Sequence, residues 1–435
     1  MYFRLYPSKN NTIYQFYDKN GNIETWSSSI NTGANPIMEL MDGKGTSKLL
    51  FNFDIPQWLQ DKLDTYTYTA NFKLWDAGTL FNPPIRLKNV VLSTFTQDFA
   101  EGDGYAFLKP KAKTGVSNFI NRLDGQLWSA VTFTDLTTYH LNSINEDLNF
   151  DVTTVVTGAN VKFRLQIQSF LSDADNVYTK FIHSRHTNTL FKPFIEFVIN
   201  DEIEDNHNLL IAGQVNKLYL FNQIHENFTG TLSASVKSEN GTITTPAIQN
   251  PDTAVYYIEI TPSNPTNNLK DEYVEVSWLI DNEVQFRELI KVQSANQIFS
   301  KKPYELKNLY YYVTTPYSNN IIRQNDIVPF EVVSEIRGYG TVVDNNYEYK
   351  VISADGFEMV PWMPVSVYKD KMTFVLDTSF YFPEQQYEVI LRNKSSQWTR
   401  TSHLTYKFKV VQDGPSHLRE LSMSPYYSRT YFFSK

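Results

Sequence analysis

The chain contains no cysteine, and this absence removes several kinds of chemistry. Without thiols there is no disulfide, no zinc–thiolate site and no cysteine nucleophile. The common sequence motifs of catalysis are missing too, because no Gly-x-Ser-x-Gly elbow, phosphate-binding loop or His-Glu-x-x-His is present. We therefore expect a protein that is not an enzyme, with no catalytic, cofactor-binding or metal-binding residues.

Long apolar runs are also absent. No stretch approaches the roughly 18 apolar residues of a membrane span, and residues 1–7 lack the apolar core of a signal peptide. These observations predict a protein that is made in the cytoplasm and does not insert into a membrane. Release from the cell by lysis would fit this pattern.

Charge is scarce, and its balance is acidic. Asp, Glu, Lys and Arg make up 20% of the chain, and the formal net charge is −8. Phosphate binding needs a concentrated Lys and Arg surface, and no run of either residue stands out. The sequence thus argues against a nucleic-acid partner.

Aromatic residues are abundant instead, with 28 Tyr and 30 Phe among 435 residues. Such residues favour pleated, half-buried strands. Apolar residues alternate around residues 49–53, 161–167, 347–351 and 387–391, which is typical of strands with one buried face. The best helix candidate is the short segment Pro56–Leu63. These patterns predict an all-β protein with many short strands.

Two polar breaks divide the chain. Residues 200–208 are acidic and polar and read as a linker, and a second break falls near residues 297–303. We expect β-sandwich domains at residues 1–201, 208–297 and 303–413. Residues 414–435 form either an extended arm that packs on a neighbour or a frayed tail.

The first 201 residues carry a series of weak motifs in a consistent order. They are Thr12–Tyr14, Asn31–Gly33, Ser47–Asp54, Asn71–Trp75, Phe99–Gly104 with Asn121 and Trp128, Asn149–Thr153, and Lys180–Thr189 with Pro193–Phe197. Together they resemble the DNRLRE-type domain, a carbohydrate-binding-module-like β-sandwich found in bacteriophage structural proteins. The resemblance implies a jelly-roll-like sandwich followed here by two immunoglobulin-like sandwiches.

A second, weaker resemblance lies in the middle of the chain. Pro251–Tyr257 is similar to the tyrosine-corner stretch of immunoglobulin domains, in which a Tyr hydroxyl bonds back to the backbone. Ile258 stands where the usual cysteine would be. This resemblance favours a Greek-key sandwich.

Few polar residues are candidates for chemistry. Glu101 and Asp103 lie in a glycine-rich loop and could bind Ca²⁺, but we favour a structural role in which Glu101 accepts backbone N–H bonds and Gly102 and Gly104 supply positive φ. His183 and His186 would point to opposite faces of a hairpin, which is unsuited to joint metal ligation. No cofactor is expected.

The tryptophans could serve as sugar-stacking platforms, although most are expected in cores. The candidates are six of the seven tryptophans: Trp58, Trp75, Trp128, Trp278, Trp362 and Trp398. Trp362 is the exception, because Pro361 and Pro364 are expected to hold its segment out of regular pairing. An exposed tip for a protein contact and burial in a core are equally supported there.

The favoured hypothesis is a bacteriophage virion component, an adaptor or ring protein of the tail, neck or baseplate that assembles with other virion proteins, in a homo-oligomeric ring. The alternative is a tail-fibre protein that binds host surface glycans. The candidate inter-subunit contacts are aromatic residues near both ends of the chain and at the proline-flanked segment: Tyr2, Phe3, Tyr6, Trp362, Tyr426, Tyr427, Tyr431 and Phe432.

Overall fold

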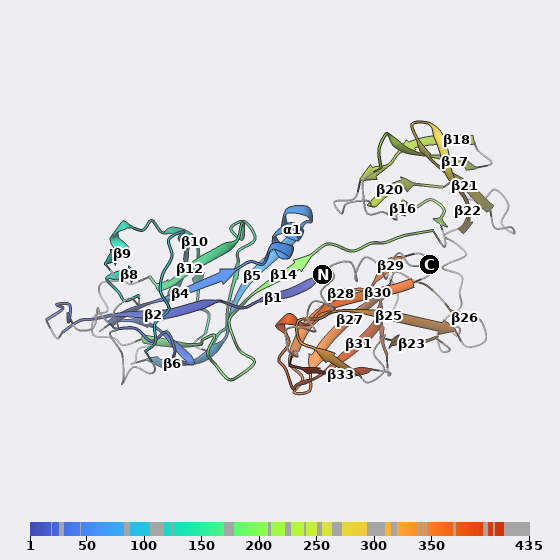
Figure 1. The fold of residues 1–435 in the computed structure, drawn as a ribbon. Coiled ribbons are helices and arrows are strands. Elements are labelled where there is room, and N and C mark those ends of the chain that lie inside the picture. Colours follow the sequence, from blue (N-terminus) through green and yellow to red (C-terminus); the bar gives the residue numbers. More distant parts are fainter. Residues whose placement is uncertain are drawn as a thin grey trace. The chain divides into compact units, whose positions relative to one another are not determined.

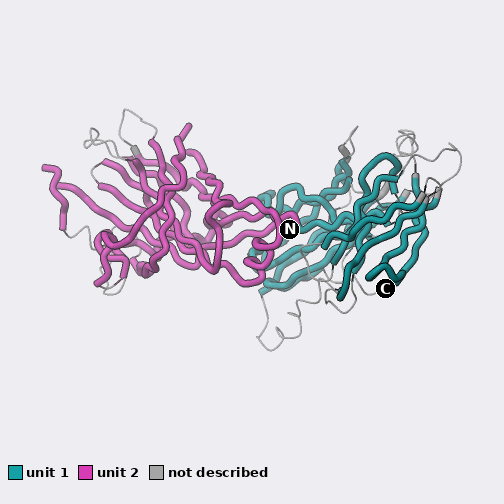
Figure 2. The backbone as a smooth tube through the Cα atoms, turned by 90° about the horizontal axis from the view of Figure 1, so that it is seen from above, with its two compact units in different colours: residues 1, 201–435 teal, residues 2–200 magenta. Residues whose placement is uncertain are grey.

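The computed structural model divides the chain into two compact units, one of residues 2–200 and one of residue 1 with residues 201–435 (Figure 2). Each is described below by itself. The structure describes residues 1–412 except 19, 26–29, 44, 82–87, 105–116, 124, 144, 169–177, 208–209, 222–227, 239–240, 250–254, 263–271, 294–308, 315–319, 337–339, 342, 344–345, 369–370, 395–398 and 403–404.

The first sandwich is built almost entirely of antiparallel strands and also contains the α-helix α1 (Figure 1). Its elements are β1 (Tyr2–Leu5), β2 (Lys9–Phe16), β3 (Ile37–Asp42), β4 (Gly45–Asp54), α1 (Gln57–Thr65), β5 (Tyr68–Leu74), β6 (Asp76–Phe81), β7 (Asn89–Thr94), β8 (Asn121–Leu123), β9 (Gln126–Leu127), β10 (Thr134–His140), β11 (Leu148–Asp151), β12 (Asn160–Ile167), β13 (Tyr178–His183) and β14 (Phe194–Ile199).

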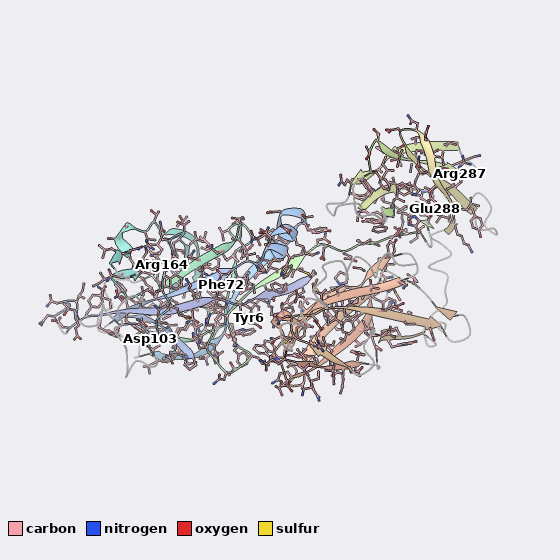
Figure 3. All side chains as sticks on the ribbon, in the orientation of Figure 1. Tyr6, Phe72, Asp103, Arg164, Arg287 and Glu288 are labelled. Atoms are coloured by element: carbon pink, nitrogen blue, oxygen red, sulfur yellow. The ribbon has the colours of Figure 1, made fainter. Side chains whose placement is uncertain are left out.

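These strands form a five-stranded sheet in the order β10-β7-β12-β4-β2, a four-stranded sheet β1-β14-β5-β11 and a three-stranded sheet β3-β13-β6. Phe72 of β5 joins the two larger sheets, because it packs on Phe51 and Phe53 of β4 and stacks on Phe163 of β12 at 5.1 Å between ring centroids. Figure 3 marks Phe72 in the middle of this sandwich. The aromatic composition thus builds the core between the sheets.

A second apolar cluster covers the outer face of the five-stranded sheet. Phe95, Phe99 and Trp128 come from the connection between β7 and β10, and they pack on Ile13 and Leu50. Trp128 also donates from its indole N–H to the Asn118 carbonyl oxygen at 2.7 Å and is 8% exposed. This tryptophan is therefore a core residue rather than a sugar platform.

The second sandwich has the strand order of immunoglobulin domains. Its strands are β15 (Leu210–Ile211), β16 (Asn216–Phe221), β17 (Leu232–Ser238), β18 (Gly241–Pro246), β19 (Ile248–Gln249), β20 (Val255–Ile260), β21 (Glu272–Ile280) and β22 (Glu283–Gln293). One sheet runs β15-β22-β21-β17-β18 and the other β16-β20-β19, which is the Greek-key pairing of that fold. Trp278, 1% exposed, fills its core.

The third sandwich repeats this arrangement. Its strands are β23 (Leu309–Thr314), β24 (Ile321–Arg323), β25 (Ile327–Ile336), β26 (Gly340–Thr341), β27 (Tyr347–Ser353), β28 (Glu358–Pro364), β29 (Ser366–Tyr368), β30 (Lys371–Asp377), β31 (Gln386–Lys394), β32 (Thr399–Thr401) and β33 (Tyr406–Val411). The sheets β23-β25-β30-β29 and β24-β33-β31-β27-β28 meet where Phe374 stacks on Phe330 at 5.0 Å and on Tyr349 at 4.0 Å.

The local sequence predictions mostly hold. The expected helix is α1, which begins after Pro56, and the four alternating segments are the strands β4, β12, β27 and β31. The all-β fold class is confirmed.

The expected tyrosine corner in the second sandwich is wrong. Residues 255–260 form β20, which pairs with β16 and β19, the position of the fifth strand in the immunoglobulin order rather than the sixth. The Tyr256 hydroxyl accepts a bond from the backbone N–H of Phe228 at 3.1 Å. A tyrosine corner occurs in the third sandwich instead, where the Tyr387 hydroxyl near the start of β31 donates to the Phe382 carbonyl oxygen at 3.1 Å.

Candidate functional sites

The predicted contact residues at the start of the chain lie in the core of the first sandwich. Tyr2 and Phe3 belong to β1 and are each 4% exposed. The Tyr2 hydroxyl donates to Glu196 Oε2 at 2.6 Å, and Phe3 packs edge-on against Trp58 at 5.0 Å. Tyr6 is half-buried. These side chains leave little surface for a neighbouring subunit, and their role in assembly stays a prediction.

A buried arginine joins this strand to its neighbour. The Arg4 Nε donates to the Tyr2 hydroxyl at 2.9 Å, and the guanidinium lies 4.4 Å from the ring centre of Phe194. Glu196 also forms an ion pair with Lys73, with 2.7 Å between Lys73 Nζ and Glu196 Oε2. Burial and the carboxylate of Glu196 raise the pKa of Tyr2 and outweigh the opposite effect of Arg4, so its hydroxyl stays protonated. The cluster fixes β1 on β14.

Glu101 in the glycine-rich loop anchors two other segments of the first sandwich. Its Oε1 accepts the backbone N–H of Asn10 at 3.0 Å, and the same oxygen lies 3.3 Å from Arg185 Nε and 3.1 Å from His186 Nε2. His183 is directed elsewhere, since its ring stacks on Phe191 at 5.5 Å. The arrangement agrees with the structural role predicted for Glu101 and does not bring the two histidines together.

The expected positive φ at Gly102 and Gly104 is wrong, because neither residue is among the positive-φ glycines. Their small size is needed for close packing instead. A Cβ atom on Gly102 would lie 2.8 Å from Asn11 Oδ1 and nearer still to Asn31 Oδ1. Both asparagines are fully buried and cannot move aside. Position 102 can therefore hold only a residue without a side chain.

Trp362 lies in β28, a regular strand that pairs with β27. The prediction that Pro361 and Pro364 hold this segment out of pairing is therefore wrong. The strand accommodates the prolines through register shifts, opposite Tyr349–Val351 and Val351–Ile352 of β27.

The Trp362 side chain is neither an exposed tip nor a core residue, because it lies half-buried on the face of its sheet. The Arg392 guanidinium is 4.0 Å from its ring centre, and Arg392 Nε donates to Glu348 Oε2 at 2.5 Å. Lys350 and Lys394 lie nearby, 5.9 Å from the ring and 3.5 Å from the Glu348 carboxylate respectively. Tryptophan and arginine are frequent anchors of protein interfaces. We call this group the Trp362 surface.

The remaining predicted contact residues, Tyr426, Tyr427, Tyr431 and Phe432, lie outside the described residues, as does the arm of residues 414–435. Trp398 lies outside them as well.

The predicted linker is held by an extensive set of bonds that sequence reasoning missed. Asp205 Oδ1 accepts from His207 Nδ1 at 2.5 Å, and His207 Nε2 lies 2.9 Å from Glu288 Oε1 on β22. The same Glu288 oxygen accepts the Trp278 indole N–H at 3.1 Å. We call residues 203–207 together with Glu288 and Trp278 the His207 junction. Figure 3 marks Glu288 in the second sandwich.

The linker also bonds to the third sandwich. Asp205 N–H donates to the Val367 carbonyl oxygen at 2.9 Å, and Val367 N–H donates to the Ile203 carbonyl oxygen at 3.1 Å. Glu204 forms a parallel bridge with Val367 of β29. The backbone of the linker is thus paired with β29 rather than exposed to solvent.

Within the described ranges, no group of three or more His, Asp or Glu side chains lies close enough to hold a metal ion. Over the same residues, no helix is both long and apolar enough to cross a membrane.

Comparison with known proteins assigns no family. No protein-family model matches the chain, and no curated protein matches it. Similar solved structures include the Yersinia pseudotuberculosis adhesin InvE, at 11% identity and a TM-score of 0.17 over 46% of this chain and 56% of the adhesin. They also include the FN1–FN3 domains of chicken CNTN1, at 10% identity and a TM-score of 0.17 over 78% and 95% of the two chains. Similarity this low identifies no relative.

The fold and sites therefore define a class, an all-β protein of successive sandwiches. The resemblance of residues 1–201 to the DNRLRE-type domain stays a prediction.

Proposed function

We propose that this chain is a structural component of a bacteriophage virion, an adaptor in a ring of the tail, neck or baseplate. It acts without catalysis, by packing pre-folded sandwich domains against copies of itself and against other virion proteins.

The observation that carries the proposal is the His207 junction. A linker of a few unpaired polar residues would let neighbouring domains turn freely. Here Asp205 and His207 are buried in ion pairs, and Ile203 to Asp205 continue into backbone bonds with Val367. A connection with this many specific bonds has few accessible conformations, which suits a spacer that must present fixed surfaces.

The Trp362 surface is a second observation that supports the same proposal. It places a tryptophan, an arginine and further charged groups on one sheet face of the third sandwich. Such a mixture can give a partner both an apolar anchor and oriented charge pairs.

Immunogold labelling of purified particles, with antibody raised against the recombinant chain, tests the proposal. A ring of label at the neck, tail or baseplate is the expected result. Label confined to fibre tips would favour the glycan-binding alternative, and particles without label would overturn the virion assignment.

Mass measurement of the purified chain and a binding assay on immobilised polysaccharides separate the two functions further. An adaptor is expected to be a monomer or a closed ring and to leave the polysaccharides unbound. Binding to a host polysaccharide by the isolated chain would contradict the adaptor role.

A further inference from the structure

The His207 imidazole lies between two carboxylates and is nearly removed from water. Its side chain is 9% exposed, the Asp205 side chain is 0% exposed and that of Glu288 is 19% exposed. Each ring nitrogen lies within hydrogen-bond distance of one carboxylate oxygen. A neutral imidazole can donate from only one nitrogen, whereas the imidazolium donates from both. The geometry therefore fits the charged form.

The surroundings of the ring also favour its charge. Burial opposes protonation, but the hydrogen bonds and the negative charges of Asp205 and Glu288 outweigh it and raise the pKa of His207 to about 9. The ordinary value for histidine is about 6.5. At neutral pH the imidazolium therefore bridges the two carboxylates.

Other charged groups lie around this pair but do not replace the imidazolium. On β16, Lys217 pairs with Glu259 of β20 at 3.6 Å. Burial and neighbouring charges, those of Asp205, Glu204 and Glu259 among them, raise the pKa of Tyr219 to about 12, so this tyrosine stays neutral where His207 titrates. His207 is the cation that bridges Asp205 and Glu288, with one ring nitrogen paired to each carboxylate.

The same segment is paired with β16 through its backbone. Asn206 N–H donates to the Lys217 carbonyl oxygen at 2.8 Å, and Lys217 N–H donates to Asn206 Oδ1 at 2.8 Å. Tyr219 N–H donates to Asp205 Oδ1 at 3.3 Å. The docked segment is short, and it is held on the second sandwich by these few bonds together with the two ion pairs of His207.

We propose that protonated His207 is a lock that keeps the linker docked on the second sandwich, and that loss of its proton releases the linker. The inference rests on the geometry of the junction and does not depend on a virion function. The carboxylates of Asp205 and Glu288 repel each other once the cation between them is gone. The linker then exchanges its docked state for a solvated one.

The sign of the pH dependence follows from the raised pKa. A group whose pKa is higher in the docked state stabilises that state fully below its ordinary value of about 6.5. The stabilisation is lost as pH rises through the docked value of about 9. Docking should therefore weaken only about twofold between pH 5.5 and 6.5 and should weaken progressively between pH 7 and 10.

Hydrogen–deuterium exchange of the full chain, followed by peptide mass spectrometry, measures this docking. Protection factors, which correct for the intrinsic pH dependence of exchange, are compared for residues 203–207 at pH 6.5 and pH 10. A pKa of about 9 in the docked state, against the ordinary value of about 6.5, predicts a ~150-fold loss of protection between these two pH values in the wild type. A peptide from β12 in the first sandwich serves as the internal reference.

Two variants make the test specific. His207→Gln keeps hydrogen-bonding capacity but not the charge, so its linker should be weakly protected at both pH values. His140→Gln, which changes an exposed histidine of the first sandwich, should behave as the wild type. Equal protection of the wild-type linker at both pH values would overturn the proposal, even if His207→Gln failed to fold. So would full, pH-dependent protection in His207→Gln.

Discussion

Gly102→Ala should destabilise the first sandwich even though the backbone of Gly102 is compatible with alanine. The new methyl group would lie 2.8 Å from Asn11 Oδ1 and in severe overlap with Asn31 Oδ1. Both asparagines are 0% exposed, so neither can turn its amide into solvent. Asn11 also donates to the Ser117 hydroxyl oxygen at 2.6 Å, which resists displacement.

The magnitude follows from the cost of overpacking. Added methyl groups in well-packed cores cost about 1–3 kcal/mol, and two immovable contacts place this case at the upper end, about 2–3 kcal/mol. For a unit of this size each kcal/mol lowers the melting temperature by roughly 2–4 °C. The first sandwich should therefore melt roughly 5–10 °C lower.

Differential scanning calorimetry of the full chain measures this shift in the transition of the first sandwich. Asn31→Gly added to Gly102→Ala removes the side chain that the methyl group overlaps. The double variant should therefore lose less stability than the sum of the single variants, by at least 1 kcal/mol in a double-mutant cycle.

Gly158→Ala is the matched control. Its φ is +76°, and a Cβ atom there would meet nothing within 4 Å. The substitution should lower the free energy of unfolding only by the strain of a left-handed backbone, about 1 kcal/mol. If Gly102→Ala changes stability by less than the control, the close-packing explanation is refuted.

Three further substitutions test the core, the corner and the surface. Phe72→Ala should cost about 3–5 kcal/mol in denaturant unfolding, because it opens a cavity among stacked rings. Tyr387→Phe should cost about 1–2 kcal/mol in the third sandwich, since the backbone groups of Phe382 lose their partner. Trp362→Ala should lower stability by only about 1 kcal/mol, the contact with Arg392 being half-exposed, yet reduce incorporation into particles. Normal incorporation would exclude the Trp362 surface from assembly.

The strands and α1 were accessible from the sequence because their signals are local. Alternation places side chains on two faces whatever the partner strand, so β4, β12, β27 and β31 could be predicted one by one. Pro56 marks the start of α1 for a similarly local reason.

The wrong predictions concern features that depend on the position of a strand in its sheet. Val255–Ile260 has the residues of a tyrosine-corner strand, but its neighbours β16 and β19 give it another position in the Greek key. Pro361 and Pro364 predict a broken strand, yet the adjacent β27 accepts them through shifts of register. Strand order is a property of the whole domain and has no signature in six residues.

The candidate sites were least predictable because their members are far apart in the sequence. His207 and Glu288 are separated by 81 positions, and no local pattern associates them. Gly102 was recognised as a required glycine, but the reason depends on Asn31, which is 71 positions earlier along the chain.

The strands at the ends of the first two sandwiches differ in direction, and this affects how each would bear mechanical load. In the first, β1 and β14 are antiparallel and Tyr2 lies opposite Val198, so tension applied at the two ends would separate the hydrogen bonds one after another. In the second, β15 and β22 are parallel, and tension along the chain would load their bonds together in shear. Under tension, the first sandwich would thus extend before the second.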